Sequence, residues 1–111
     1  MSTVVFLTTA SSSPWTVPGD WNNANNTIEG LGSGGSGSFG GSNEKGGGGG
    51  AYAKAVNATL SGTAAFVVGA KNGGSDTSFT SVLVAKSGTN GASGGAAGVG
   101  GAAASCTPTT G

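Results

Sequence analysis

A run of glycine and serine between Gly30 and Gly50 constrains this sequence more than any other stretch. It reads GLGSGGSGSFGGSNEKGGGGG, has no aliphatic residue after Leu31 and ends in five consecutive glycines. A helix is excluded there, because each glycine destabilises a helix by about 1 kcal/mol relative to alanine. Such sequence usually forms a flexible linker. Because patterned apolar segments flank this glycine centre on both sides, we expect a long ordered loop or packed glycine layer that connects strands of one domain.

The length and charge of the chain limit its class. Its 111 residues suffice for one small domain with a modest core. Four acidic side chains balance four lysines, so the formal net charge is zero. That balance offers no electrostatic footprint for nucleic acid or an anionic membrane. The N-terminal residues lack the basic and apolar regions of a signal peptide, and no stretch approaches the roughly 18 apolar residues of a transmembrane helix. We expect no nucleic-acid partner and no membrane insertion.

Strand-like segments occur on both sides of the glycine centre. β-branched or alternating apolar patterns predict extended segments at 3–8, 15–17, 27–31, 51–60, 63–69 and 77–86. Asn72-Gly73 is a strong hairpin signal between the last two. The predicted fold is all-β, a small antiparallel sandwich or jelly-roll-like domain over residues 1–87 with the glycine-rich loop 30–50. The predicted core consists of Val5, Leu7, Trp15, Val17, Ile28, Val56, Leu60, Phe66, Val68, Phe79, Val82 and Val84.

The C-terminal segment, residues 88–111, has its own character. Gly88, Gly91, Gly94 and Gly100 fall in one three-residue register, and Gly95, Gly98 and Gly101 fall in a second. Polyproline II packing has three residues per turn and needs glycine where backbones touch. The alternative is a disordered low-complexity tail. In the first case the segment would pack on residues 1–87 or on a neighbouring subunit.

Residue types needed for catalysis are scarce. The chain has no histidine, which removes the commonest general base, the serine triads and most zinc sites. A G-x-G-x-x-G match begins at Gly32, but it is expected by chance in so glycine-rich a chain, and no helix follows it. Cys106, the single cysteine, is interpreted as an inert thiol rather than a nucleophile. We expect no enzymatic activity, no cofactor and no bound metal.

Several aromatic side chains are candidates for packing or for partner contact. Trp15 and Tyr52 lie in strand-like segments, where a core or subunit-contact position is expected. Phe39 stands alone among small residues and either fills the core beneath the loop or projects as an anchor for a partner. Trp21, beside an asparagine-rich stretch, has sugar stacking as an alternative role. Trp21, Phe39 and Tyr52 are therefore the candidate partner-contact residues.

Short motifs follow one another in a defined order: WTVP (15–18), NNTIE (25–29), GGGGGAY (46–52), FVVGA (66–70) and GGSDTSF (73–79). Together they resemble the glycine-rich domain of bacteriophage and prophage tail proteins, over roughly residues 5 to 106. Lys71 and Asn72 depart from the family's hairpin, where further glycines stand. Members usually continue with more glycine-rich repeats after the Ala-Ser-Cys segment, whereas this sequence ends at Gly111. The shorter end favours a small accessory subunit repeated on a virion surface.

The resemblance implies a non-enzymatic structural protein of a bacteriophage virion, associated with the tail or tail fibre or decorating the surface. Expected partners are other virion proteins and copies of the chain itself, because a thin core gains stability from neighbours. Two other classes stay open. One is an adhesin that binds a host receptor or glycan through the glycine-rich loops, favoured by exposed aromatics clustered at one end. The other is an ice-binding protein of packed polyproline II helices, which requires the three-residue register over most of the chain.

Overall fold

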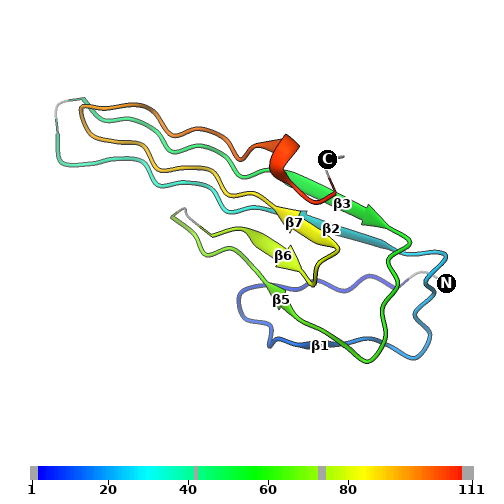
Figure 1. Ribbon diagram of the computed structural model, residues 1–111. Coiled ribbons are helices and arrows are strands. Elements are labelled where there is room, and N and C mark those ends of the chain that lie inside the picture. Colours follow the sequence, from blue (N-terminus) through cyan, green and yellow to red (C-terminus); the bar gives the residue numbers. More distant parts are fainter. Residues whose placement is uncertain (1–2, 42, 73–74, 109–111) are drawn as a thin grey trace.

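Figure 1 shows the fold in a computed structural model that describes residues 3–41, 43–72 and 75–108. This part of the chain forms short β-strands and one 3-10 turn, with no α-helix. Strand β1 pairs with β4, β2 pairs with β3, and β5, β6 and β7 form a three-stranded sheet, all antiparallel. The predicted all-β class with small antiparallel sheets is confirmed. The elements are β1 (Trp15–Thr16), β2 (Thr27–Leu31), β3 (Tyr52–Val56), β4 (Thr63–Ala64), β5 (Phe66–Val67), β6 (Thr77–Phe79), β7 (Leu83–Ala85) and η1 (Ala103–Ser105).

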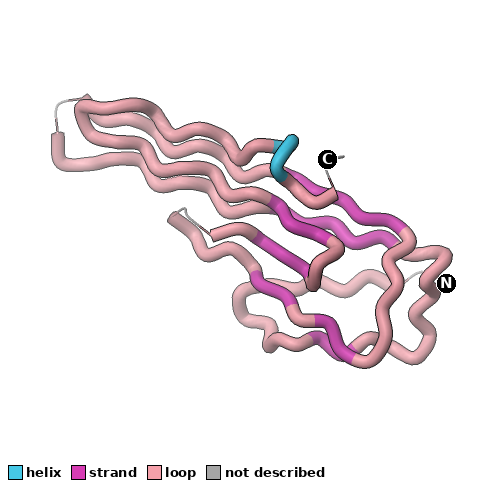
Figure 2. The backbone as a smooth tube through the Cα atoms, viewed as in Figure 1, coloured by secondary structure: helices cyan, strands magenta, loops and turns pink. Residues whose placement is uncertain are grey.

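The molecule has a strand-containing half and an arm. Four extended segments without strand assignment run side by side away from the strands. Two turns join them in pairs at the far end (Figures 1 and 2). The principal-axis extents of 55 × 27 × 23 Å reflect this arm. We call it the glycine bundle and its members segments A (32–38), B (45–51), C (86–92) and D (96–102).

The β2–β3 pair determines how the arm begins. Its register places Leu31 opposite Tyr52 at the end of β2, so segments A and B continue the same antiparallel pair outward. Side chains alternate across a strand, and in β3 the buried positions are alanines, whereas Tyr52, Lys54 and Val56 face solvent. This small-residue face lets β7 lie against both β2 and β3. A Cβ at Gly30 would lie only 2.6 Å from Leu83 Cδ2, so any larger residue there would require the Leu83 side chain to move.

The hydrophobic core is made mostly of small residues. Leu83 is the large side chain buried most completely, with 1% of its surface exposed. Phe66 and Phe79 are buried beside it, and Trp15 packs on Phe79 with ring centroids 5.9 Å apart. The remaining buried members of the core are Ala51, Ala53, Ala55, Ala64, Ala85 and Cys106.

The N-terminal segment is not the strand that its β-branched run predicts. Residues 3–8 have no strand assignment, and Val4 and Phe6 are 72% and 83% exposed. Val5, predicted in the core, is also exposed, and only Leu7 of this segment packs against the core. The strand prediction was wrong because β propensity reflects packing on a neighbouring strand, and none of the strands in the described residues pairs with this segment.

The segment 77–86 forms two strands instead of the predicted single one. β6 and β7 pair through a tight turn in which Thr80 has a φ of 48° and Val82 N–H donates to Phe79 C=O at 3.2 Å. The reversal brings Phe79 opposite Leu83, so both large side chains enter the core. A predicted strand over 63–69 is likewise divided, into β4 and β5.

The predicted core needs two further corrections. Val56 is exposed because it shares the solvent face of β3 with Lys54. Val84 is half-buried, and the inward positions of β7 belong to Leu83 and Ala85. Apart from the buried Phe66 and Phe79, the other predicted members pack against the core while partly exposed: Leu7, Trp15, Val17, Ile28, Leu60, Val68 and Val82.

Candidate functional site

Backbone hydrogen bonds spaced three residues apart hold the glycine bundle together. Three residues are one turn of a polyproline II helix, and this spacing recurs at every contact between the segments. Segments B and C each form hydrogen bonds with all three other segments. Segments A and D bond to B and C and not to each other among the described residues. The bonds, N–H to C=O, are Gly32–Ala51 (2.8 Å), Gly35–Gly48 (2.8 Å) and Ser38–Lys45 (2.9 Å) between A and B; Gly48–Thr89 (2.9 Å) and Ala51–Lys86 (2.8 Å) between B and C; Gly88–Ser33 (2.9 Å) and Gly91–Ser36 (2.9 Å) between C and A; Thr89–Val99 (2.9 Å) and Ala92–Ala96 (3.0 Å) between C and D; and Gly98–Gly46 (2.7 Å) and Gly101–Gly49 (2.8 Å) between D and B.

Glycine occupies the positions where two backbones touch. A Cβ at Gly35 would lie 1.9 Å from Thr89 O, and one at Gly88 would lie 2.2 Å from Gly48 O. Because the opposing atoms are backbone carbonyls, they cannot turn aside as a flexible side chain does. Gly32, Gly47, Gly50, Gly91, Gly98 and Gly101 are restricted in the same way. The bundle therefore depends on missing side chains, not on buried apolar ones.

The five-glycine run divides into inward and outward positions. A Cβ at Gly47, Gly48 or Gly50 would lie 1.9–2.1 Å from a backbone oxygen of segment A or D, whereas Gly46 and Gly49 face open space. Positive φ angles among the described glycines occur at Gly40, Gly62 and Gly94, outside this run. Close approach of backbones, and not an unusual φ, is what requires glycine here.

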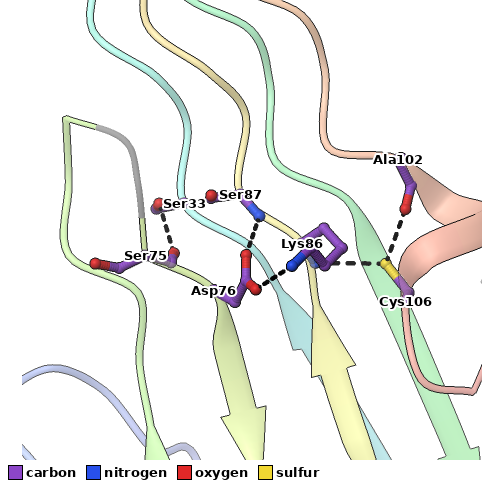
Figure 3. Close-up of polar contacts among 7 residues, drawn as sticks. All are labelled: Ser33, Ser75, Asp76, Lys86, Ser87, Ala102 and Cys106. Carbon is purple, nitrogen blue, oxygen red and sulfur yellow. Dashed lines mark hydrogen bonds and ion pairs between the residues drawn. The ribbon is translucent and has the colours of Figure 1, made fainter.

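A polar network closes the bundle at its base, beside the strands (Figure 3). Lys86 Nζ forms an ion pair with Asp76, whose other carboxylate oxygen accepts the Ser87 N–H at 2.8 Å. The buried Cys106 thiol accepts the Lys86 N–H at 3.4 Å and lies 3.6 Å from Ala102 O. Ser33 Oγ donates to Ser75 O at 2.9 Å. These bonds tie segments A, C and D to Ser75 and Asp76, which precede β6, and to the C-terminal turn.

This network changes the pKa of the Asp76 carboxyl group. The Lys86 ammonium group, followed by the Ser87 N–H, holds the pKa of Asp76 below its ordinary value. Asp76 is half-buried, although a carboxylate beside a turn is ordinarily expected at the solvated surface. The pairing spans 10 residues and had no signal in the sequence.

The two turns at the end of the arm form its tip, built from residues 38–41, 43–45 and 92–96. Gly94 N–H donates to Asn43 O at 3.0 Å and joins the two turns, and Lys45 N–H donates to Ser38 Oγ at 2.7 Å. Phe39 belongs to this tip and is 89% exposed. Of the two roles predicted for Phe39, the structure contradicts core filling and leaves projection toward a partner.

The other two candidate contact residues lie in the strand-containing half. Trp21 is half-buried, packs edge-on against Trp15 at 5.9 Å and donates its Nε1–H to Ala58 O at 3.3 Å. Tyr52 is 37% exposed, and its hydroxyl donates to the Glu29 carboxylate, which raises the pKa of Tyr52. The structure therefore does not bring Trp21, Phe39 and Tyr52 together in one site.

A shallow hollow lies on the outer face of β5 and β6. It encloses about 390 Å³ and is lined by Ser13, Ala65, Phe66, Val67, Ser78 and Thr80. None of these side chains is a general base or a charged group. Sequence reasoning did not find this hollow, because it depends on the division of 63–69 and 77–86 into shorter strands.

The described residues hold neither a cluster of metal ligands nor a membrane-spanning helix. No three His, Cys, Asp or Glu side chains among them lie close enough to share a metal ion. Nor does this part of the chain contain a helix long and apolar enough to span a bilayer.

Comparisons with known proteins return no match: no family model, curated protein or solved structure is significantly similar to this chain.

Proposed function

We propose that this chain is a non-enzymatic structural subunit of a bacteriophage virion, associated with the tail or tail fibre or decorating the particle surface. The glycine bundle carries the proposal. Its segments are joined by regularly spaced backbone hydrogen bonds and touch without intervening side chains. Such an arm holds its tip at a fixed distance from the strands, which suits a subunit that makes contacts. The order of the WTVP, GGGGGAY and GGSDTSF motifs supports a phage particle as the setting.

The polar groups of the chain also favour a structural role. The buried side-chain nitrogen and oxygen atoms of the described residues all have hydrogen-bond partners. Asp76 and Lys86 neutralise each other and the carboxylate accepts a backbone N–H. Groups satisfied in this way stabilise a fold, whereas catalytic groups need an open position toward a substrate.

The test is the location of the chain in particles made by the organism that encodes it. Purified particles, analysed by quantitative mass spectrometry and labelled with antibody for electron microscopy, should contain the chain in several copies at one location. A chain that remains in the soluble fraction while complete particles lack it would contradict the proposal.

A second candidate function, the adhesin, is favoured by one observation. Phe39 projects from the tip of a long arm with 89% of its surface exposed, and an exposed aromatic is a common anchor in recognition. The exposed aromatics do not cluster at one end, however, since Phe6 lies in the other half. In a cell-binding assay, Phe39→Ser should abolish binding if the tip is the adhesive site. Val99→Ser, at an exposed position on the side of the arm, is the matched control.

The ice-binding alternative receives less support. It requires the three-residue register over most of the chain, whereas in the described residues this spacing of backbone hydrogen bonds is confined to segments A to D.

A further inference from the structure

The segment of residues 3–7 has the composition of a strand but no strand neighbour. Among the described residues, no backbone N–H or C=O of Thr3 through Leu7 forms a hydrogen bond. Val4 and Phe6 are 72% and 83% exposed. In an extended strand these two side chains share one face, so the segment presents an apolar, uncharged strand face to solvent.

Strand β5 has an open edge. Thr80 N–H donates to Ala65 O at 2.8 Å, and Val67 is paired with Ser78 of β6. The backbone groups of Ala65 and Val67 therefore point to β6. The backbone groups of the alternate residues, Phe66 and Val68, point the other way. Phe66 N–H donates to Ser13 Oγ at 3.1 Å. Neither the N–H nor the C=O of Val68 bonds to a described residue, so the edge is open beyond Phe66.

An apolar hollow lies beside this edge. It is the cavity of about 390 Å³ on the outer face of β5 and β6, and Val67, one of its walls, is 56% exposed. Its lining contains no charged side chain. A strand added along β5 would lie next to the hollow, where an aromatic side chain can be inserted.

We propose that residues 3–7 of one copy of this chain add as a β-strand to the β5 edge of a second copy, with Phe6 in the hollow. Strand addition satisfies backbone groups on both sides, and the filling side chain supplies the specificity. Residues 3–7 are a free strand-like segment, the edge beside β5 is open beyond Phe66, and no hydrogen bond joins the two among the described residues. A reciprocal exchange between two copies therefore satisfies both at once. A net charge of zero sets no long-range repulsion against this contact.

This contact deepens the proposed function, because it identifies how copies of a repeated subunit meet. The proposed contact rests on the proposed function in one respect, because a repeated subunit brings copies of the chain close together. If the contact fails while the chain is found in particles, other virion proteins make the contacts and the structural role stands. If the chain self-associates but is absent from particles, the virion role fails and the contact stands.

The first experiment is cross-linking between two full-length single variants. Phe6→Cys and Val67→Cys chains, mixed and mildly oxidised, should form a disulfide-linked heterodimer, detected by mass spectrometry of the joined peptides. The native Cys106 is buried and 3% exposed. Phe39→Cys replaces Phe6→Cys in the control mixture, because Phe39 is as exposed but lies at the tip of the arm. The proposal is overturned if both mixtures cross-link to the same extent or if neither does.

The second experiment measures association without new cysteines. Sedimentation velocity of the unmodified chain over a range of concentrations should show a dimer that dissociates on dilution. Phe6→Ser should weaken its association at least tenfold, and Phe39→Ser should leave it unchanged. A chain that is monomeric at all concentrations overturns the proposal, as does an equal effect of the two substitutions. Because both side chains are exposed, neither variant is expected to lose its fold.

Discussion

Substituting alanine at Gly48 tests whether the arm depends on backbone contact. A methyl group there would lie 2.0 Å from Val99 O, 2.2 Å from Val99 C and 2.7 Å from Gly100 N. Ordinary contact requires 3.4 Å or more, so segment D must move away. Gly49, the next residue, has no atom within 4 Å of the corresponding position and provides the matched control.

The expected cost of Gly48→Ala combines two effects. Overpacking in a filled interior costs about 1–3 kcal/mol. Displacing segment D also weakens its bonds to segment B, Gly98–Gly46 at 2.7 Å and Gly101–Gly49 at 2.8 Å, each with a net contribution of about 1 kcal/mol. We expect a total loss of about 3 kcal/mol, or about 10–20 °C in melting temperature for a domain of this size. Gly49→Ala should stabilise by about 0.5 kcal/mol, since it restricts the unfolded chain.

Thermal and urea unfolding, followed by circular dichroism and by the fluorescence of Trp15 and Trp21, measure this difference. Gly47→Ala and Gly50→Ala should resemble Gly48→Ala, and Gly46→Ala should resemble Gly49→Ala. If all five variants unfold at the same temperature, the run is a flexible linker and the packed bundle does not form.

Two further predictions concern the core and the base of the arm. Leu83→Ala should destabilise the fold by about 3 kcal/mol, because it leaves a cavity at a fully buried position. Val56→Ala, on the solvent face, should change the unfolding free energy by less than about 0.5 kcal/mol. Equal urea midpoints for the two variants would refute this assignment of buried and exposed positions. Asp76→Asn should cost about 1 kcal/mol at neutral pH, because the carboxylate accepts two bonds to the Lys86 and Ser87 nitrogens. Since the pKa of Asp76 is lowered from 3.8 in the folded chain, its stabilisation is present above the unfolded-state pKa and is lost as the pH falls below it. The difference between the parent and Asp76→Asn should therefore disappear in acid, and a difference that persists there would contradict the role of the charge.

The sequence predicts the strands that have local signals. β2 and β3 follow from alternation in TIEGL and YAKAV, and the Asn72-Gly73 signal falls between β5 and β6, which do pair, although Gly73 lies outside the described residues. What alternation cannot supply is which face is buried. In β3 the small face, with Ala53 and Ala55, is inside, and β7 packs against this strand.

The bundle was predictable only in part. Glycines at spacing three from Gly88 onward indicate polyproline II packing, and the five-glycine run indicates an ordered layer. The packing of these two regions on each other is a contact between residues distant in sequence, as in the bond from Gly98 N–H to Gly46 C=O. The three-residue spacing of Gly32 and Gly35, and of Gly47 and Gly50, was the signal that could have joined them.

The Thr3–Thr8 strand and the buried Val5 were predicted from residue type alone. Propensity cannot show whether an edge is available, and here the segment has no strand neighbour within the described chain. The Asp76–Lys86 pair was missed for a similar reason, because it forms only after β6 and β7 reverse direction at Thr80.

Hydrogen exchange of the individual glycine amides tests the central claim most directly. In the bundle, the N–H groups of Gly35, Gly48 and Gly88 donate to backbone carbonyls, whereas those of Gly34 and Gly49 donate to no described residue. Two-dimensional NMR should therefore show slow exchange at the first three and fast exchange at the other two, a pattern that repeats every three residues. Uniformly fast exchange across the glycines, at rates typical of an unfolded chain, would contradict an ordered bundle.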